Sequence, residues 1–129
     1  MKRFLTPGLA MLAGMAIGAF AIQGLHAQAK PPVYFIAEID VSNPDAYAKE
    51  YAPKAQAMIK AAGGRFLAIG AGPKVTTFEG DPPKRFVLQV WDSMDKIQAW
   101  RNNPDYQALR KIGDQYAKFR SFAVEGMAQ

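Results

Sequence analysis

The chain has 129 residues, half of them hydrophobic, with 16 Lys and Arg, 11 Asp and Glu and no cysteine. These values are typical of one globular domain and exclude a disordered or collagen-like chain. The lack of cysteine excludes disulfides, thiolate nucleophiles and Cys-ligated metals. The single histidine, His26, lies in a segment that we expect to be removed, so the mature protein would also lack imidazole catalysis and His-ligated metals.

The first 29 residues have the pattern of a secretory signal peptide. A basic start (residues 2–3) precedes an apolar stretch (residues 9–22) and the small-residue site Ala27-Gln28-Ala29. The apolar stretch is shorter than the roughly 20 residues that a membrane-spanning helix needs. We therefore expect cleavage after Ala29, with cleavage after Ala27 or an uncleaved anchor as alternatives. The mature domain would cover residues 30–129 and be exported, periplasmic or secreted, with no stable membrane anchor.

The charge pattern gives no sign of a nucleic-acid partner. Cleavage removes 2 of the 16 basic residues and none of the 11 acidic ones. The remaining basic residues are spread along the chain, so there is no basic patch for a phosphate backbone, and we expect no nucleic acid among the partners.

From residue 30 onward, strand and helix patterns alternate. Residues 33–41 (VYFIAEIDV) predict a strand with apolar odd-numbered side chains and a mixed even-numbered face that includes Tyr34 and Glu38. Asn43-Pro44-Asp45 is typical of a helix start and Gly63-Gly64 of a helix end. We expect Pro53 to kink or split this helix, because proline lacks the N–H group that the helix uses.

Residues 64–80 predict extended structure with a turn at residues 70–73, and residues 85–91 (RFVLQVW) predict a second clear strand. We assign its apolar face to Phe86, Leu88 and Val90, and its mixed face to Arg85, Val87, Gln89 and Trp91. Ser93 caps a short predicted helix, Asn103-Pro104-Asp105 begins another, and residues 119–126 predict a last strand.

This β-α-β-β-α-β order predicts an α+β ferredoxin-like fold, a four-stranded antiparallel sheet with two helical segments on one face. The helices would cover the apolar strand faces. The mixed faces would then expose an apolar patch, which we assign to Tyr34, Ile36, Val87 and Trp91. A second copy of the sheet is the simplest cover, so we expect a homodimer.

Several short motifs occur along the domain: Asp45-x-Tyr47-x-x-x-Tyr51, Gly63-Gly64-Arg65-Phe66-Leu67, Glu79-Gly80, Arg85, Ser93, Ala99-Trp100, Pro104-x-Tyr106 and Glu125-Gly126. Together they resemble the domain of unknown function 1330 family, within the dimeric α/β-barrel superfamily. The similarity covers residues 33–126. The resemblance implies a dimeric α/β barrel formed sheet to sheet, and it implies no established activity.

Glu38 is the candidate catalytic residue, because it interrupts a half-buried strand face. It would act as a general base or as an anchor for a polar ligand group, or else as a hydrogen-bonded structural residue. The candidate ligand-binding residues are Tyr34, Arg65, Arg85, Gln89 and Trp91. The two arginines would hold an anion or form salt bridges. Tyr47, Tyr51, Trp100 and Tyr106 are interpreted as core residues on helical stripes rather than as ligand contacts.

The function predicted from sequence is that of an exported homodimer that binds a small organic molecule, with no metal and no cofactor. The alternative is a small cofactor-independent enzyme, monooxygenase-like or isomerase-like, that uses a carboxylate and an arginine in a cleft on the sheet face. This alternative rests on analogy with related α/β barrels. Whether the protein is an enzyme stays open at this point.

Overall fold

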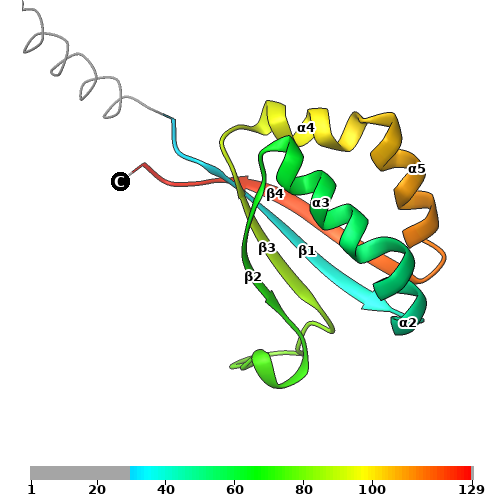
Figure 1. Ribbon diagram of the computed structural model, residues 1–129. Helices are drawn as coiled ribbons and strands as arrows, with labels where there is room; N and C mark the ends of the chain where they lie inside the picture. Colours follow the sequence, from blue (N-terminus) through cyan, green and yellow to red (C-terminus); the bar gives the residue numbers. More distant parts are fainter. Residues whose placement is uncertain (1–29, 129) are drawn as a thin grey trace, which may run out of the picture. The chain divides into compact units, whose positions relative to one another are not determined.

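The computed structural model of the protein describes residues 30–128 (Figure 1), so the predicted signal peptide lies outside the described residues. The elements in chain order are β1 (Val33–Val41), α2 (Pro44–Ala46), the π-helical turn η1 (Tyr47–Tyr51), α3 (Ala52–Ala62), β2 (Arg65–Gly70), the 3-10 turn η2 (Gly72–Lys74), β3 (Phe86–Trp91), α4 (Met94–Asn102), α5 (Pro104–Gly113) and β4 (Ala117–Glu125). None of the helices formed by these residues has the length and apolar character needed to cross a bilayer.

The four strands form one antiparallel sheet in the order β2-β3-β1-β4. The helices α3, α4 and α5 lie over one face of this sheet (Figure 1). This arrangement confirms the predicted α+β ferredoxin-like fold. β2 ends at Gly70, and residues 75–85 form no strand, so the extended structure predicted up to residue 80 is shorter than expected.

The first helical segment is split as its proline predicts. Asn43 caps α2 and accepts a hydrogen bond from the backbone N–H of Ala46 at 3.2 Å. One turn of π-helix follows, in which the N–H of Ala52 donates to the carbonyl of Tyr47, and α3 resumes with Pro53 in its first turn. Proline has no N–H to donate there, and the wider turn accommodates it.

The second helical segment consists of α4 and α5, each with its predicted cap. The Ser93 hydroxyl accepts from the N–H of Lys96 at 3.2 Å, and the Asn103 side chain accepts from the N–H of Asp105 at 2.8 Å. Gly63 ends α3 in the left-handed conformation, with φ of 111°, as a helix-ending glycine does. The sequence therefore located the starts of α4 and α5 and the end of α3 correctly.

The strand register decides which side chains face the helices. The odd-numbered side chains of β1 from Val33 to Ile39 are buried, as predicted. Val33 lies opposite Trp91 and Phe35 lies opposite Gln89. Opposite residues of an antiparallel pair project to the same face. The odd-numbered residues of β3 therefore face the helices, and the predicted assignment of the two faces of β3 is wrong.

The reason for this error lies in the composition of β3, which has apolar residues on both faces. Trp91 is fully buried and is the largest such side chain in the described core. Gln89 is also buried, and its side-chain oxygen accepts a hydrogen bond from Trp91 Nε1 at 2.8 Å. A buried amide that is hydrogen-bonded in this way costs little, so a polar residue does not mark the solvent side of this strand.

The opposite side of the sheet is the open face, which carries no helix from residues 30–128 (Figure 1). It is formed by the even-numbered side chains of β1, β3 and β4, namely Tyr34, Ile36, Glu38, Asp40, Phe86, Leu88, Val90, Lys118, Arg120, Phe122 and Val124. Phe122 is 45% exposed and Val124 is 51% exposed. An apolar open face is thus confirmed, but Val87 and Trp91 do not belong to it.

Candidate ligand-binding site

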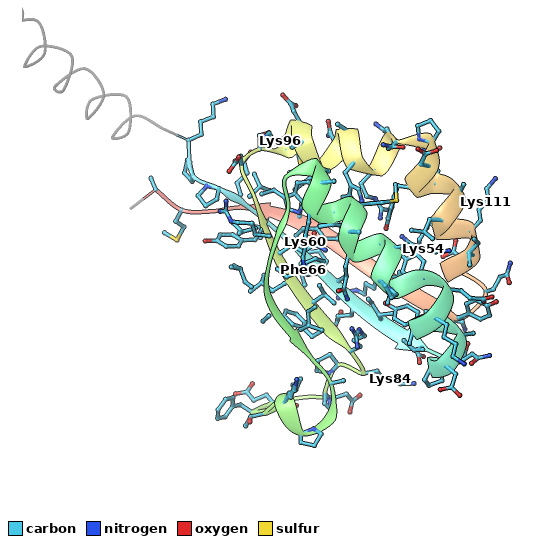
Figure 2. All side chains as sticks on the ribbon, viewed as in Figure 1. Lys54, Lys60, Phe66, Lys84, Lys96 and Lys111 are labelled. Atoms are coloured by element: carbon cyan, nitrogen blue, oxygen red, sulfur yellow. The ribbon has the colours of Figure 1, made fainter. Side chains whose placement is uncertain are left out.

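A cavity of about 60 Å³ lies between the helical layer and the covered face of the sheet. It is lined by Phe35, Ala37, Ile39, Tyr47, Tyr51, Ala52, Ala55, Gln56, Ile59, Phe66, Ile69, Arg85, Val87, Gln89, Trp100, Arg101, Tyr106, Arg110, Phe119 and Ser121. Most of these side chains are apolar or aromatic, and a small number are polar. Phe66 lies on the side of β2 that faces α3, whereas the lysines labelled on the helices are exposed (Figure 2).

Two buried tyrosines supply hydroxyl groups to this cavity. Tyr51 lies at the end of the π-helical turn and Tyr106 in the first turn of α5, and their hydroxyl oxygens are 3.2 Å apart. The pKa of Tyr51 is raised well above its usual range. Burial is the main cause, and the neighbouring Tyr106 adds to the increase. The Tyr51 hydroxyl therefore stays protonated at any physiological pH.

Tyr47 stands at the other end of the π-helical turn, beside Arg85. The guanidinium carbon of Arg85 is 5.8 Å from the centroid of the Tyr47 ring. Burial raises the pKa of Tyr47, and the Arg85 charge opposes part of this rise. Tyr47 and Tyr51 are the two ends of the π-helical turn that precedes Pro53, and both line the cavity. The turn therefore positions two of the three tyrosines of the lining, and Tyr106 is the third.

Trp100, on α4, is the centre of the aromatic wall. Its ring stacks on Trp91, with centroids 5.2 Å apart, and contacts Phe35 edge to face and the ring of Tyr106. The guanidinium carbon of Arg101 lies 5.5 Å from its ring centroid. The indole nitrogen Nε1 of Trp100 is buried and has no hydrogen-bond partner among the described residues.

Arg85 lies at the boundary between the cavity and the protein surface. Its Nε atom is also buried and has no hydrogen-bond partner among residues 30–128. A surface cleft of about 400 Å³, between the end of β1 and the loop before β3, shares Ile39, Tyr47, Ala52 and Arg85 with the cavity. Arg85 therefore lines both spaces.

The charges around the cavity are all positive. Arg85, Arg101 and Arg110 are part of the lining, and none of the described lining residues is Asp or Glu. Arg110 is partly neutralised, because its Nε donates to Asp114 at 3.0 Å. Within the described part of the chain, no group of three or more His, Cys, Asp and Glu side chains is placed to hold a metal ion.

The structure places the predicted site residues on both faces of the sheet. Arg85 and Gln89 line the cavity, and Trp91 contacts both Gln89 and Trp100 behind the cavity wall. Tyr34 and Glu38 lie on the open face. Arg65 is exposed on β2 opposite Val90 and so belongs to the open side as well. The predicted grouping of Glu38 with Arg85 and Gln89 on one face is therefore wrong.

Glu38 is paired with a neighbour that the sequence did not indicate. Its carboxylate accepts a hydrogen bond from Arg120, directly opposite on β4. The two side chains keep 38% and 72% of their surface exposed. In the described chain, Glu38 is therefore a cross-strand ion-pair partner on the open face, separated by the sheet from the cavity.

The cavity-lining residues that sequence reasoning missed are the polar-tipped aromatics. Tyr47, Tyr51, Trp100 and Tyr106 are buried, which confirms them as core residues, and all four line the cavity. A usable signal is their chemistry: four aromatic side chains on the helical stripes each carry a hydroxyl or N–H group that needs a partner when buried. Leucine or phenylalanine would fill a purely structural core without this requirement.

Solved structures with similar folds have low sequence identity to this chain. A protein of unknown function from Rhodopseudomonas palustris is 15% identical, with a TM-score of 0.58, and the match covers 76% of this chain and 84% of that one. SnoaB, a cofactor-independent oxygenase from Streptomyces nogalater, is 14% identical with a TM-score of 0.55, covering 77% and 96% of the two chains. A protein from Mycobacterium tuberculosis is 18% identical with a TM-score of 0.50, covering 76% and 97%. These similarities establish the fold.

Sequence comparison gives a more specific result. Among curated proteins, none is significantly similar to this chain. Residues 32–127 match the domain of unknown function (DUF1330). This match covers almost the whole of the described domain and agrees with the motifs from Asp45 to Gly126 noted in the sequence. The chain belongs to the DUF1330 family.

Proposed function

We propose that this protein is an exported, homodimeric domain that binds a small organic molecule in the cavity between its helices and its sheet. The observation that carries the proposal is that buried polar groups without partners, Trp100 Nε1 and Arg85 Nε, belong to residues that line an otherwise apolar cavity. Concave, apolar sites with a few convergent polar groups are typical of ligand pockets.

The energetics favour a ligand over an empty core. A buried polar group without a hydrogen bond costs about 1–3 kcal/mol. Two such groups beside one cavity are a substantial cost for a domain whose total stability is on the order of 10 kcal/mol. A ligand that accepts hydrogen bonds from these groups removes the cost and occupies the space, so binding and folding stabilise each other.

The experiment uses the two tryptophans, Trp91 and Trp100, which are the only ones in the chain. Because Trp100 lines the cavity and Trp91 stacks on it, ligand entry should change the intrinsic fluorescence. We expect a screen of small organic acids, amides and alcohols to give ligands that change the fluorescence and raise the melting temperature.

A matched pair of variants tests whether these ligands enter the cavity. Ala55 is buried and lines it, whereas Ala57, on the same helix, is exposed. Ala55→Leu fills the space and should abolish the ligand response, while Ala57→Leu should keep it. If both variants respond like the unmodified protein, the cavity is not the binding site and this proposed function is wrong.

A cofactor-independent enzyme remains the second candidate. The hydroxyl pair of Tyr51 and Tyr106 and the Arg85 guanidinium would stabilise negative charge that develops on a bound oxygen atom. The carboxylate-and-arginine form of this candidate would instead use Glu38 and Arg120, which lie on the open face and line a surface cleft there, and not Glu38 with Arg85. Oxygen consumption during incubation with the screened ligands decides the case for oxygenase chemistry, since a pure binding protein consumes none.

Export is tested independently of the ligand. If the predicted signal is cleaved, N-terminal sequencing of the protein from the periplasmic fraction should start at Lys30, or at Gln28 if the alternative site is used. Intact Met1 on protein in the membrane fraction would contradict this part of the proposal.

A further inference from the structure

Among the residues that line the cavity, the buried side-chain atoms without a partner are hydrogen-bond donors. Trp100 Nε1 and Arg85 Nε carry N–H groups and cannot accept. In the Tyr51–Tyr106 pair, one hydroxyl donates to the other, and the second hydroxyl hydrogen has no acceptor among the described residues. A ligand that satisfies these groups must therefore bring acceptors.

Gln89 adds two more donors, and its orientation is unambiguous. Indole N–H groups only donate, so the atom that Trp91 Nε1 contacts at 2.8 Å must be the amide oxygen of Gln89. This contact uses one of the two lone pairs of the amide oxygen. The NH₂ group of Gln89 takes no part in it and can donate to a ligand in the cavity that Gln89 lines.

The remaining polar lining does not reverse this balance. Gln56 and Ser121 carry both donors and acceptors, but Gln56 is only half-buried and Ser121 is exposed. Arg85, Arg101 and Arg110 are positive, and the described lining includes no carboxylate. The site therefore disfavours cations and donor-rich molecules and favours a group that only accepts hydrogen bonds and carries negative charge.

The position of Arg85 and the size of the cavity narrow the ligand further. Arg85 is shared by the cavity and the surface cleft, so an anion bound to it lies at the boundary between the two. The cavity of about 60 Å³ is much smaller than the roughly 150 Å³ that encloses benzene in an engineered protein core. Only a short apolar tail fits beyond Arg85.

We propose that this site takes a small monocarboxylate, whose carboxylate binds the Arg85 guanidinium and whose short apolar tail enters among the aromatic side chains. The inference rests on the proposed function and specifies its ligand class. The planar guanidinium matches the geometry of a carboxylate, and the other N–H and O–H groups of the cavity lining are available to donate to its remaining lone pairs.

The test compares sodium butanoate with butanamide, which has the same carbon chain but is neutral and carries donors. Titrations are followed by tryptophan fluorescence at constant pH and ionic strength. We expect butanoate to bind about tenfold more tightly, since hydrogen bonds to charged groups are the stronger kind. From acetate to butanoate, affinity should rise about fourfold for each buried methylene group. Equal affinity for butanoate and butanamide, or no saturable binding of butanoate, would overturn the inference.

The variants Arg85→Gln and Arg65→Gln form a matched pair, because Arg65 is exposed on the other side of the sheet. Arg85→Gln should abolish the preference for butanoate over butanamide, whereas Arg65→Gln should keep it. The measured quantity is the ratio of the affinities of one protein for butanoate and butanamide. A change in protein stability alone therefore does not change this ratio. Arg85→Lys, which keeps the charge but not the planar fork, should give an intermediate preference and serves if Arg85→Gln does not fold.

The outcomes separate this inference from the proposed function. If neutral probes bind as tightly as butanoate and their response is lost in Ala55→Leu, the cavity is a ligand site and only the carboxylate class is wrong. If the preference for butanoate survives in Arg85→Gln, Arg85 is not the anion contact and the inference fails. If no probe of any class gives a response that Ala55→Leu removes, both the inference and the proposed function fail.

Discussion

The hydroxyl groups of Tyr51 and Tyr106 lie 3.2 Å apart in the core. The pKa of Tyr51 is raised, mainly by burial and also by the neighbouring Tyr106. A raised pKa in the folded state makes stability depend on pH. Above about pH 10 the unfolded chain ionises Tyr51 while the folded chain keeps the proton. The unfolded state then binds fewer protons, so the free energy of unfolding falls as the pH rises.

Tyr51→Phe tests this linkage. Near neutral pH, the variant should be about 1 kcal/mol less stable, because the hydrogen bond with Tyr106 is lost. Above pH 10, the unmodified protein should lose up to about 1.4 kcal/mol per pH unit through Tyr51, a loss that the variant does not show. Urea unfolding between pH 8 and pH 11 measures both, and we expect the stability difference to shrink across this range. Parallel curves for the two proteins would show that Tyr51 does not carry the effect.

For Glu38, strand parity predicted the correct face of the sheet but not the neighbour of its side chain. Its mid-strand position suggested a functional carboxylate, but it pairs with Arg120 across the strands. Since the sheet separates it from the cavity, Glu38→Gln should leave ligand affinity within about twofold of the unmodified protein, and loss of a largely exposed ion pair should cost less than about 1 kcal/mol. Fluorescence titration and urea unfolding check the two values. A large loss of affinity would restore Glu38 as a candidate functional residue.

At the scale of elements, the sequence determined most helix boundaries and failed on one strand face. The caps at Asn43, Ser93 and Asn103 are local signals, and all three are confirmed. The buried face of β3 includes the polar residue Gln89, which is hydrogen-bonded to Trp91. The alternation of polar and apolar residues along the strand does not indicate such a contact. The cavity arises from the packing of four helical elements, η1, α3, α4 and α5, on the sheet. For that reason sequence periodicity alone did not predict it.

The contact between α5 and the π-helical turn depends on a glycine. A Cβ atom added to Gly113 would lie 2.5 Å from Cδ1 of Tyr51, too close without a shift of the ring. We expect Gly113→Ala to lower the free energy of unfolding by about 1–3 kcal/mol through overpacking, despite the higher helix propensity of alanine.

A double-mutant cycle isolates this contact. In a Tyr51→Ala background the obstructing ring is absent, so Gly113→Ala should become neutral or stabilising. Urea unfolding of the four proteins gives the coupling between the two positions. Additive effects would show that the glycine is needed for the backbone of α5 and not for its approach to Tyr51.

For the whole molecule, the open face is the feature that the isolated chain leaves unexplained. Ile36, Leu88, Phe122 and Val124 form an apolar surface on the side of the sheet without helices. The Glu38–Arg120 pair lies among them and leaves no unpaired charge at its centre. An apolar sheet face with an internally paired charge fits a second copy of itself, because both subunits of a two-fold dimer present the same patch.

We therefore predict that the protein is a dimer at micromolar concentration and that Phe122→Glu makes it a monomer. Phe122 is 45% exposed in the single chain, so the new carboxylate is tolerated by the monomer but would be desolvated in the dimer. Ile112→Glu is the matched control, since Ile112 is 38% exposed but belongs to α5, in the helical layer. Sedimentation velocity should show dimers for the unmodified protein and Ile112→Glu, and monomers for Phe122→Glu, with unchanged circular dichroism. A monomeric unmodified protein would contradict the proposed dimer, and a dimeric Phe122→Glu would place the interface elsewhere, because a buried unpaired carboxylate costs several kcal/mol.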